Sequence, residues 1–72
     1  MANKPVVRFA QFVGVEDTGR GISARLNGVA GHPTPGVDGD GVRTSRVMRL
    51  EFGTDGYPAF VETKNTIFVR TA

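Results

Sequence analysis

The arginines carry the most evident binding chemistry in this sequence. A guanidinium group presents a planar set of N–H donors that matches the oxygens of phosphates and carboxylates. An aromatic ring such as Tyr57 could stack under a base while neighbouring arginines hold the phosphates of a single strand. The arginines available for such a surface are Arg25, Arg43, Arg46 and Arg49.

The charge balance favours a simpler interpretation of these arginines. The chain has nine basic and seven acidic residues, and its net charge is only +2. A phosphate-binding surface usually shows a clearer separation of charge. The same arginines are expected on an ordinary solvated sheet face, where Glu51 and Glu62 would pair with them across strands. Nucleic-acid binding by an SH3-like or OB-like module is therefore an alternative hypothesis.

Residues able to catalyse or to hold a metal are sparse. The chain has one histidine, His32, and no cysteine. No serine, cysteine or acid stands at a recognisable catalytic spacing from His32, so a structural role in a loop is favoured over proton transfer. Asp38 and Asp40 match part of a calcium loop, but its third oxygen position and its closing glutamate are missing. We expect no enzymatic activity, no cofactor and no metal site.

Uncharged polar residues suggest a second alternative. The turn at residues 63–66, TKNT, could line a small-ligand pocket together with Thr44 and Ser45. With His32, these side chains could bind a nucleotide between two subunits. The simpler interpretation is strand reversal with cross-strand threonine pairing.

The run Val42–Phe52, VRTSRVMRLEF, predicts the central strand that must position the arginines. From Met48 onward, apolar and charged residues alternate, as in a half-buried antiparallel strand. The alternation slips near Arg46 and Val47. One extra residue at that point, a β-bulge, would restore the phase.

Four other runs predict strands, because they are rich in β-branched and aromatic residues and are bounded by turn residues. The first carries apolar residues on both faces, so it is either covered on both sides or bent, for which Gly14 is the expected site. The turn at 16–21 contains two glycines able to take positive φ, and Asn65 could do the same in the last turn. The four runs are Val6–Val15, Gly21–Val29, Ala59–Thr63 and Thr66–Arg70.

Together these runs predict one all-β domain over residues 1–72, without substantial helix. We expect a five-stranded antiparallel meander that forms a small SH3-like barrel, with an open curled sheet that pairs with a second copy as the alternative. Residues 1–5 are expected to form a loose leader, and residues 30–41, with their prolines and glycines, a long loop.

The small size predicts self-association. A core in 72 residues is marginal without disulfides, and apolar residues on both faces of the outer strands favour a homodimer. The sequence has no run of eighteen apolar residues and no apolar segment typical of a signal peptide. We therefore expect a cytoplasmic protein.

Three sequence pieces resemble small uncharacterised proteins encoded by tailed bacteriophages. They are Gly31–Pro33 (GHP), Thr44–Val47 (TSRV) and Val61–Phe68 (VETKNTIF). The resemblance implies a viral accessory protein that acts in the host-cell cytoplasm by binding a host or defence protein, as an inhibitor would.

The main prediction is therefore a non-enzymatic protein that binds and modulates another protein. The long loop is the expected contact element, since binding residues concentrate on loops held by a rigid scaffold. The candidate binding residues are Arg25, Arg43, Arg46, Arg49, His32, Pro33 and Tyr57.

Overall fold

The computed structural model describes residues 4–33 and 36–71, and within them the chain forms six β-strands and no helix. No helix in this part of the chain is therefore long and apolar enough to cross a membrane. The strands are β1 (Val6–Phe9), β2 (Gln11–Asp17), β3 (Ile22–Asn27), β4 (Val42–Phe52), β5 (Pro58–Thr63) and β6 (Ile67–Arg70).

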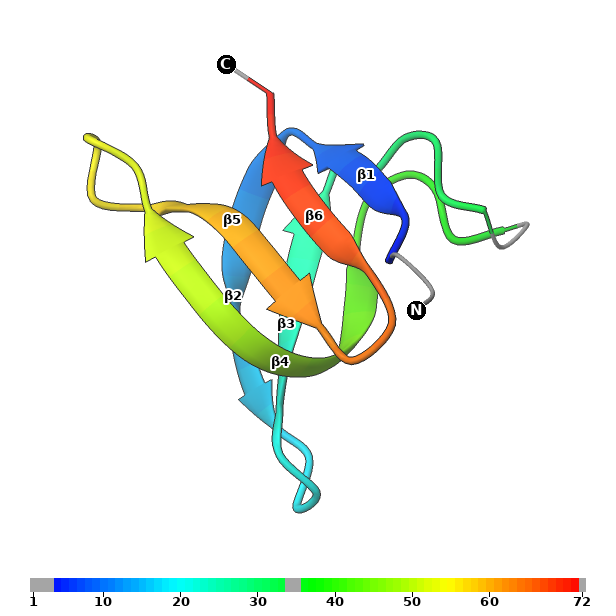
Figure 1. Ribbon diagram of the computed structural model, residues 1–72, viewed down its shortest axis with the longest axis vertical. Helices are drawn as coiled ribbons and strands as arrows, with labels where there is room; N and C mark the ends of the chain where they lie inside the picture. The colour runs from blue at the N-terminus through cyan, green and yellow to red at the C-terminus, as the bar shows by residue number, and fades with distance from the viewer. Residues whose placement is uncertain (1–3, 34–35, 72) are drawn as a thin grey trace.

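The strands form one curled sheet in the order β1-β6-β5-β4-β3-β2 (Figure 1). Four neighbouring pairs are antiparallel, whereas β1 and β6 run parallel. The predicted all-β character is confirmed. The five-stranded, wholly antiparallel meander is wrong in strand number and in one pairing, and the sheet is open, without the closure of an SH3-like barrel.

The sixth strand arises because the run Val6–Val15 breaks in two at Ala10. The backbone N–H of Ala10 leaves the strand direction and donates to the carbonyl oxygen of Asn27 at 2.9 Å. Before the break, Val7 is buried against the core, and after it Val15 is exposed. The run therefore divides at Ala10. The predicted site at Gly14 is irregular as well, because the pairing of β2 with β3 shifts register between Phe12 and Gly14.

Two irregularities in β4 lie on either side of Arg46. On the β3 side, residues Arg43 to Arg46 oppose only Ser23 to Arg25, and on the β5 side the pairing slips between Val47 and Arg49. Each slip adds one residue to β4. The predicted bulge is confirmed, and a second one was missed. A third shift, between Glu51 and Phe52, adds a residue to β5 and was also not predicted.

The two bulges change which side chains of β4 turn inward. Thr44 is buried, and Val47 and Leu50 are partly buried, so the inward positions recur every third residue. Met48 and Phe52, which simple alternation predicts to be inward with Leu50, are 55% and 65% exposed.

The core lies inside the curl of the sheet and is small. Its members share almost complete burial, and Phe12, Val42, Val47 and Leu50 pack against them. No buried side-chain nitrogen or oxygen within the described residues lacks a hydrogen-bond partner. The core residues are Val7, Phe9, Ala24, Leu26, Val29, Val61 and Phe68.

The turns use glycine where expected, with one exception. Gly19 and Gly21 have φ of 79° and 129° in the β2–β3 turn, as predicted. In the β5–β6 turn, the expected left-handed Asn65 is wrong, because only glycines have positive φ among the described residues. The hydroxyl of Thr63 closes this turn instead: it accepts from the N–H of Thr66 and donates to the Thr66 carbonyl, both at 3.0 Å.

The described part of the 30–41 loop is held by backbone pairing and by side-chain carboxylates. Val29 and Gly39 exchange two backbone hydrogen bonds, of 2.9 and 2.8 Å. Asp38 accepts from the N–H of His32 at 3.0 Å, and Asp40 accepts from the N–H of Gly28 at 2.8 Å. These two aspartates therefore clamp the loop to itself and to the end of β3.

The expected loose leader is wrong for its last two residues. The Lys4 ammonium group contacts Glu62 at 2.8 Å and the carbonyl of Thr63 at 2.9 Å. The carbonyl of Pro5 accepts from the N–H of Ile67 at 2.9 Å, which extends the pairing of β1 with β6. Residues 1–3 of the predicted leader lie outside the described residues.

Candidate functional site

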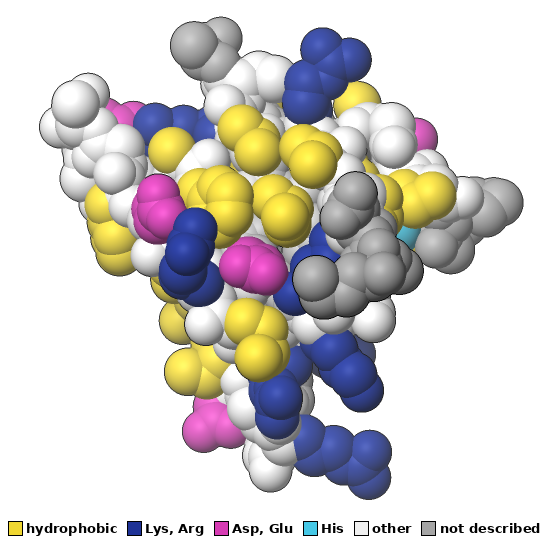
Figure 2. All heavy atoms as spheres, viewed as in Figure 1, with side chains coloured by type: hydrophobic (Ala, Val, Ile, Leu, Met, Phe, Trp, Pro, Cys, Tyr) yellow, Lys and Arg dark blue, Asp and Glu magenta, His cyan; other side chains and the backbone are white. Residues whose placement is uncertain are grey.

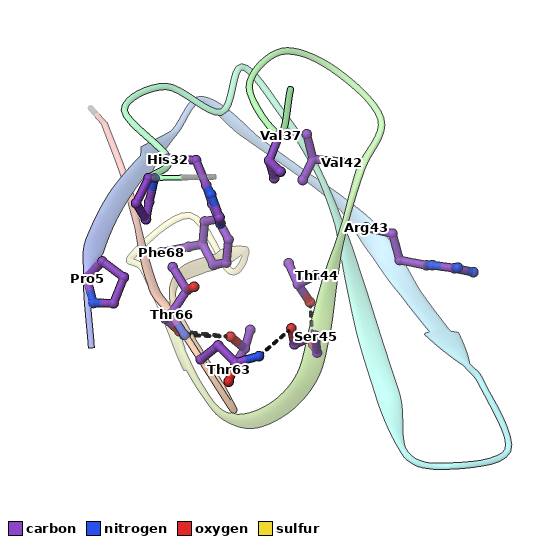
Figure 3. A pocket seen from close by; sticks show the side chains of 12 residues that line it. Pro5, His32, Val37, Val42, Arg43, Thr44, Ser45, Thr63, Thr66 and Phe68 are labelled. Atoms are coloured by element: carbon purple, nitrogen blue, oxygen red, sulfur yellow. Dashed lines mark hydrogen bonds between the residues drawn. The ribbon is translucent and has the colours of Figure 1, made fainter. Parts of the chain in front are cut away.

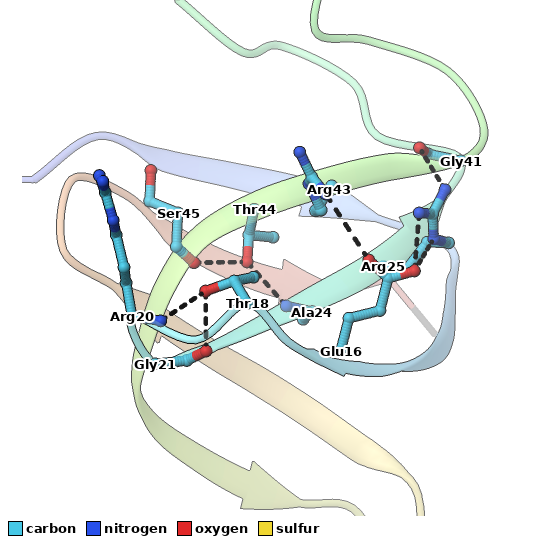
Figure 4. Close-up of polar contacts among 10 residues, drawn as sticks. All are labelled: Glu16, Thr18, Arg20, Gly21, Ala24, Arg25, Gly41, Arg43, Thr44 and Ser45. Atoms are coloured by element: carbon cyan, nitrogen blue, oxygen red, sulfur yellow. Dashed lines mark hydrogen bonds and ion pairs between the residues drawn. The ribbon is translucent and has the colours of Figure 1, made fainter.

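The predicted arginine surface contains a carboxylate at its centre. Arg25 on β3 makes two hydrogen bonds to one oxygen of Glu16, at 3.0 and 2.7 Å (Figure 4). Arg43 on β4 lies 3.9 Å from the other oxygen of Glu16. Glu16 therefore neutralises part of the positive charge where these two arginines meet.

The other two arginines are each tied to different neighbours. The aliphatic part of Arg46 covers Gly21, where an added Cβ would lie 2.4 Å from Arg46 Cδ. Arg49 pairs with Glu51 at 2.7 Å and stands 5.0 Å from the centre of the Phe60 ring. The four arginines are therefore held separately, in contrast to a continuous phosphate-binding row.

Tyr57 does not join these arginines. Its ring is 61% exposed and lines two depressions, and none of the four predicted arginines lines either one. The proposed base platform of Tyr57 with the arginines therefore has no support in the geometry.

The uncharged polar residues do converge. A cavity of about 340 Å³, the polar cavity, lies between the 30–41 loop, the start of β4 and the β5–β6 turn (Figure 3). His32 and Pro33 line it, as predicted contact residues of the loop. The other lining residues are Pro5, Val37, Val42, Arg43, Thr44, Ser45, Thr63, Asn65, Thr66 and Phe68.

A second depression has a quite different lining. This apolar groove, of about 370 Å³, lies where β2 approaches the end of β4 and the β4–β5 turn. Four of its large side chains are more than half exposed: Val13 51%, Val15 53%, Phe52 65% and Tyr57 61%. The complete lining is Phe12, Val13, Val15, Leu50, Phe52, Gly56, Tyr57 and Pro58.

The groove could not be read from the sequence beyond Tyr57. Val13 and Val15 share an alternation with the buried Val7, so the pattern alone predicts that all three face the core. The break at Ala10 and the bulges of β4 turn Val15 and Phe52 outward. A weak signal was present: apolar residues on both faces of the first run, more than a small core can bury.

An ion pair stands beside the groove. Arg70 contacts one oxygen of Asp55 at 3.0 Å, and the other oxygen of Asp55 accepts from the N–H of Tyr57 at 3.0 Å. The Tyr57 N–H, followed by the Arg70 guanidinium, lowers the pKa of Asp55 from its ordinary value of 3.8. Asp55 therefore fixes the turn that carries Tyr57.

Another apolar area lies on the outer face of the sheet. Hydrophobic side chains gather over β5 and β6, with charged side chains between and around them (Figure 2). Val6 and Val69 each follow or precede a buried residue of their strand, so they face away from the core, and they are 64% and 37% exposed. This outer face is flatter and more mixed in character than the apolar groove.

No protein-family model matches the chain, and comparisons with curated proteins and with solved structures found no match either. Among the described residues, no group of three or more histidines or acids stands close enough to hold a metal ion. Function is therefore inferred from the groove and the cavity alone.

Proposed function

We propose that this chain is a non-enzymatic protein that binds another protein through the apolar groove. The observation that carries the proposal is the exposure of Val13, Val15, Phe52 and Tyr57 in one depression. Large exposed apolar side chains that gather in one depression often mark a surface at which a protein binds a partner. Aromatic rings in a concave setting are also typical of the residues that contribute most to protein binding.

The position of β2 indicates what kind of segment fits. β2 is the last strand of the sheet and pairs only with β3 within the described residues. Its outer edge can accept one more strand, a common way of binding an extended peptide. The proposed occupant is thus an extended segment of a partner that pairs with β2 and places apolar side chains beside Val15.

The resemblance to bacteriophage proteins supplies the biological setting of the proposal. The partner is then a host or defence protein, met in the cytoplasm of the host cell. Occupation of its surface by the groove would be enough to inhibit it, without chemistry on either side.

The proposal is tested by capture from bacterial lysate with three immobilised forms of the chain. Val15→Glu places a charge in the groove, and Val6→Glu places the same charge on the outer face at a residue of similar exposure. The native chain and Val6→Glu should retain the same protein, identified by mass spectrometry, and Val15→Glu should lose it. Equal retention by all three forms, or loss with Val6→Glu alone, would exclude the groove as the binding surface.

A second copy of the chain is the competing occupant of the groove. It would give the homodimer that the small core predicts. Sedimentation equilibrium of the native chain and Val15→Glu separates the two cases. A dimer that dissociates in the variant would assign the groove to self-association and overturn the proposal of a different partner.

A further inference from the structure

The polar cavity combines an aromatic side with a hydrogen-bonding side. The rings of His32 and Phe68 stack with their centres 6.0 Å apart and their planes 29° from parallel. Ser45 stands across the cavity from them (Figure 3), and Asn65, which also lines the cavity, is hydrogen-bonded to Ser45. A planar molecule in the cavity could stack on the aromatic side and form hydrogen bonds with the polar side, because hydroxyl and amide groups bond to the polar atoms at the edge of a ring.

The loop clamp holds the aromatic side in place. Asp38 fixes the backbone of His32, and the pairing of Val29 with Gly39 closes the base of the loop. Phe68 belongs to β6 and is only 2% exposed, so it is part of the core. The cavity wall is therefore largely formed before any ligand arrives.

Thr66 supplies an unused hydrogen-bonding group. The residue is 5% exposed, and no hydrogen bond of its hydroxyl is found in the described part of the chain. Its oxygen is accessible from the cavity, because no fully buried side-chain oxygen of the described residues lacks a partner. Figure 3 shows its side chain directed into the cavity. A hydroxyl at the cavity wall can exchange its hydrogen bond to water for one to a ligand.

Ser45 and Asn65 add complementary groups. The Asn65 amide nitrogen donates to the Ser45 hydroxyl oxygen at 3.2 Å. This bond leaves the Asn65 carbonyl oxygen as an acceptor and the Ser45 hydroxyl hydrogen as a donor. Together with Thr66, the cavity can therefore both donate and accept along the edge of a ring.

The cavity lacks charge in its interior. Among the described residues that line it, Arg43 is the only lysine, arginine, aspartate or glutamate, and Figure 3 shows that its side chain points away from the cavity. Arg43 is directed instead to Glu16. A ligand carrying a negative charge would find no lysine or arginine side chain directed into the cavity, so the interior favours an uncharged molecule.

We propose that the polar cavity binds an uncharged planar heterocycle with hydrogen-bonding edges, of the class to which nucleobases and nucleosides belong. The ring stacks on His32, which is itself backed by the buried Phe68, and its edge bonds to Thr66, Ser45 and Asn65. This inference is independent of the apolar groove, which lies elsewhere on the sheet and shares no residue with the cavity.

The test is an amide NMR titration of the native chain with adenosine, guanosine, cytidine and uridine, each followed by its 5′-monophosphate. At least one nucleoside should shift the amide signals of His32, Ser45 and Asn65 in a saturable way. Its monophosphate should bind no more tightly, since the cavity offers the phosphate no cation. Absence of any saturable shift with all four nucleosides, or a clear preference for the phosphates, would overturn the inference.

Three variants assign the binding to the cavity. Thr66→Val removes the free hydroxyl at nearly constant volume and should weaken the nucleoside about fivefold or more. Thr54→Val is the matched control in the exposed β4–β5 turn and should bind like the native chain. Ser45→Ala, at an exposed position, gives the same test should Thr66→Val lose its dispersed NMR spectrum. Native affinity in a folded Thr66→Val or in Ser45→Ala would contradict the assignment.

Discussion

Asp55 shows how one carboxylate organises the turn next to the apolar groove. The Tyr57 N–H and Arg70 lower its pKa from 3.8, so the folded state holds this group ionised more strongly than the unfolded chain does. The contribution of Asp55 to the free energy of unfolding is therefore fully present at pH values above 3.8, the ordinary pKa of the group. It is lost as the pH falls through the lower pKa of the folded state.

Replacement of Arg70 tests whether its ion pair lowers the pKa of Asp55. In Arg70→Met, the pKa of Asp55 measured by carboxyl NMR should rise toward 3.8 but stay below it, because the Tyr57 N–H remains. The stability lost on acidification should also shrink in the variant. An unchanged pKa for Asp55 would show that the ion pair with Arg70 is absent in solution.

Gly28 is a position at which the fold leaves no room for a side chain. Its φ is +68°, and an added Cβ would lie 2.5 Å from the Cβ of Ala10. Gly28→Ala should therefore lower the free energy of unfolding by about 2 kcal/mol, measured by urea titration, through backbone strain and the clash together.

Gly14→Ala is the control for that substitution. Gly14 has no positive φ, and nothing lies within 4 Å of its added Cβ. This variant should change stability by less than about 0.5 kcal/mol. Equal losses at both positions would mean that the close approach of Ala10 to Gly28 does not exist.

At the scale of the element, the β5–β6 turn depends on one threonine. The Thr63 hydroxyl is buried and bonds to both the N–H and the carbonyl of Thr66. In Thr63→Val the Thr66 carbonyl keeps its bond from the Thr63 N–H, at 2.8 Å, but the Thr66 N–H loses its partner, which should cost about 1–3 kcal/mol in urea unfolding. Thr54→Val, at an exposed turn residue, should be nearly neutral, and a neutral Thr63→Val would contradict the turn geometry.

The strands were predictable to different degrees, for physical reasons. Hairpins whose turns contain Gly19, Gly21 or Gly56 follow from local turn chemistry, and each of these glycines has positive φ. The faces of β4 did not follow, since each bulge adds one residue and the alternation restarts. A pattern of Thr44, Val47 and Leu50 facing inward fits no single period of a regular strand.

The pairing of β1 with β6 could not be predicted from the sequence pattern either. It joins Val6 to Ile67, near the two ends of the chain, and its parallel direction is set by tertiary packing. The split of Val6–Val15 at Ala10 depends on the hydrogen bond from Ala10 to Asn27, which no local propensity encodes. Contacts between residues far apart in the sequence determine both the β1–β6 pairing and the break at Ala10.

At the scale of the whole molecule, the curl of the sheet creates both candidate sites. It brings the β5–β6 turn, the start of β4 and the long loop around the polar cavity. A pocket lined by Thr44, Ser45 and the 63–66 turn was one of the alternatives predicted from the sequence. The same curl brings β2 to the end of β4 and forms the groove. The groove escaped prediction because it depends on which apolar residues the bulges turn outward.

The central claim is that the apolar groove holds a partner protein. It is tested most directly by isothermal titration of the purified partner, once captured, against the native chain, Val15→Glu and Val6→Glu. We predict that Val15→Glu weakens binding about tenfold or more, because an unpaired charge would be buried, whereas Val6→Glu binds like the native chain. Native affinity in a folded Val15→Glu would contradict the claim.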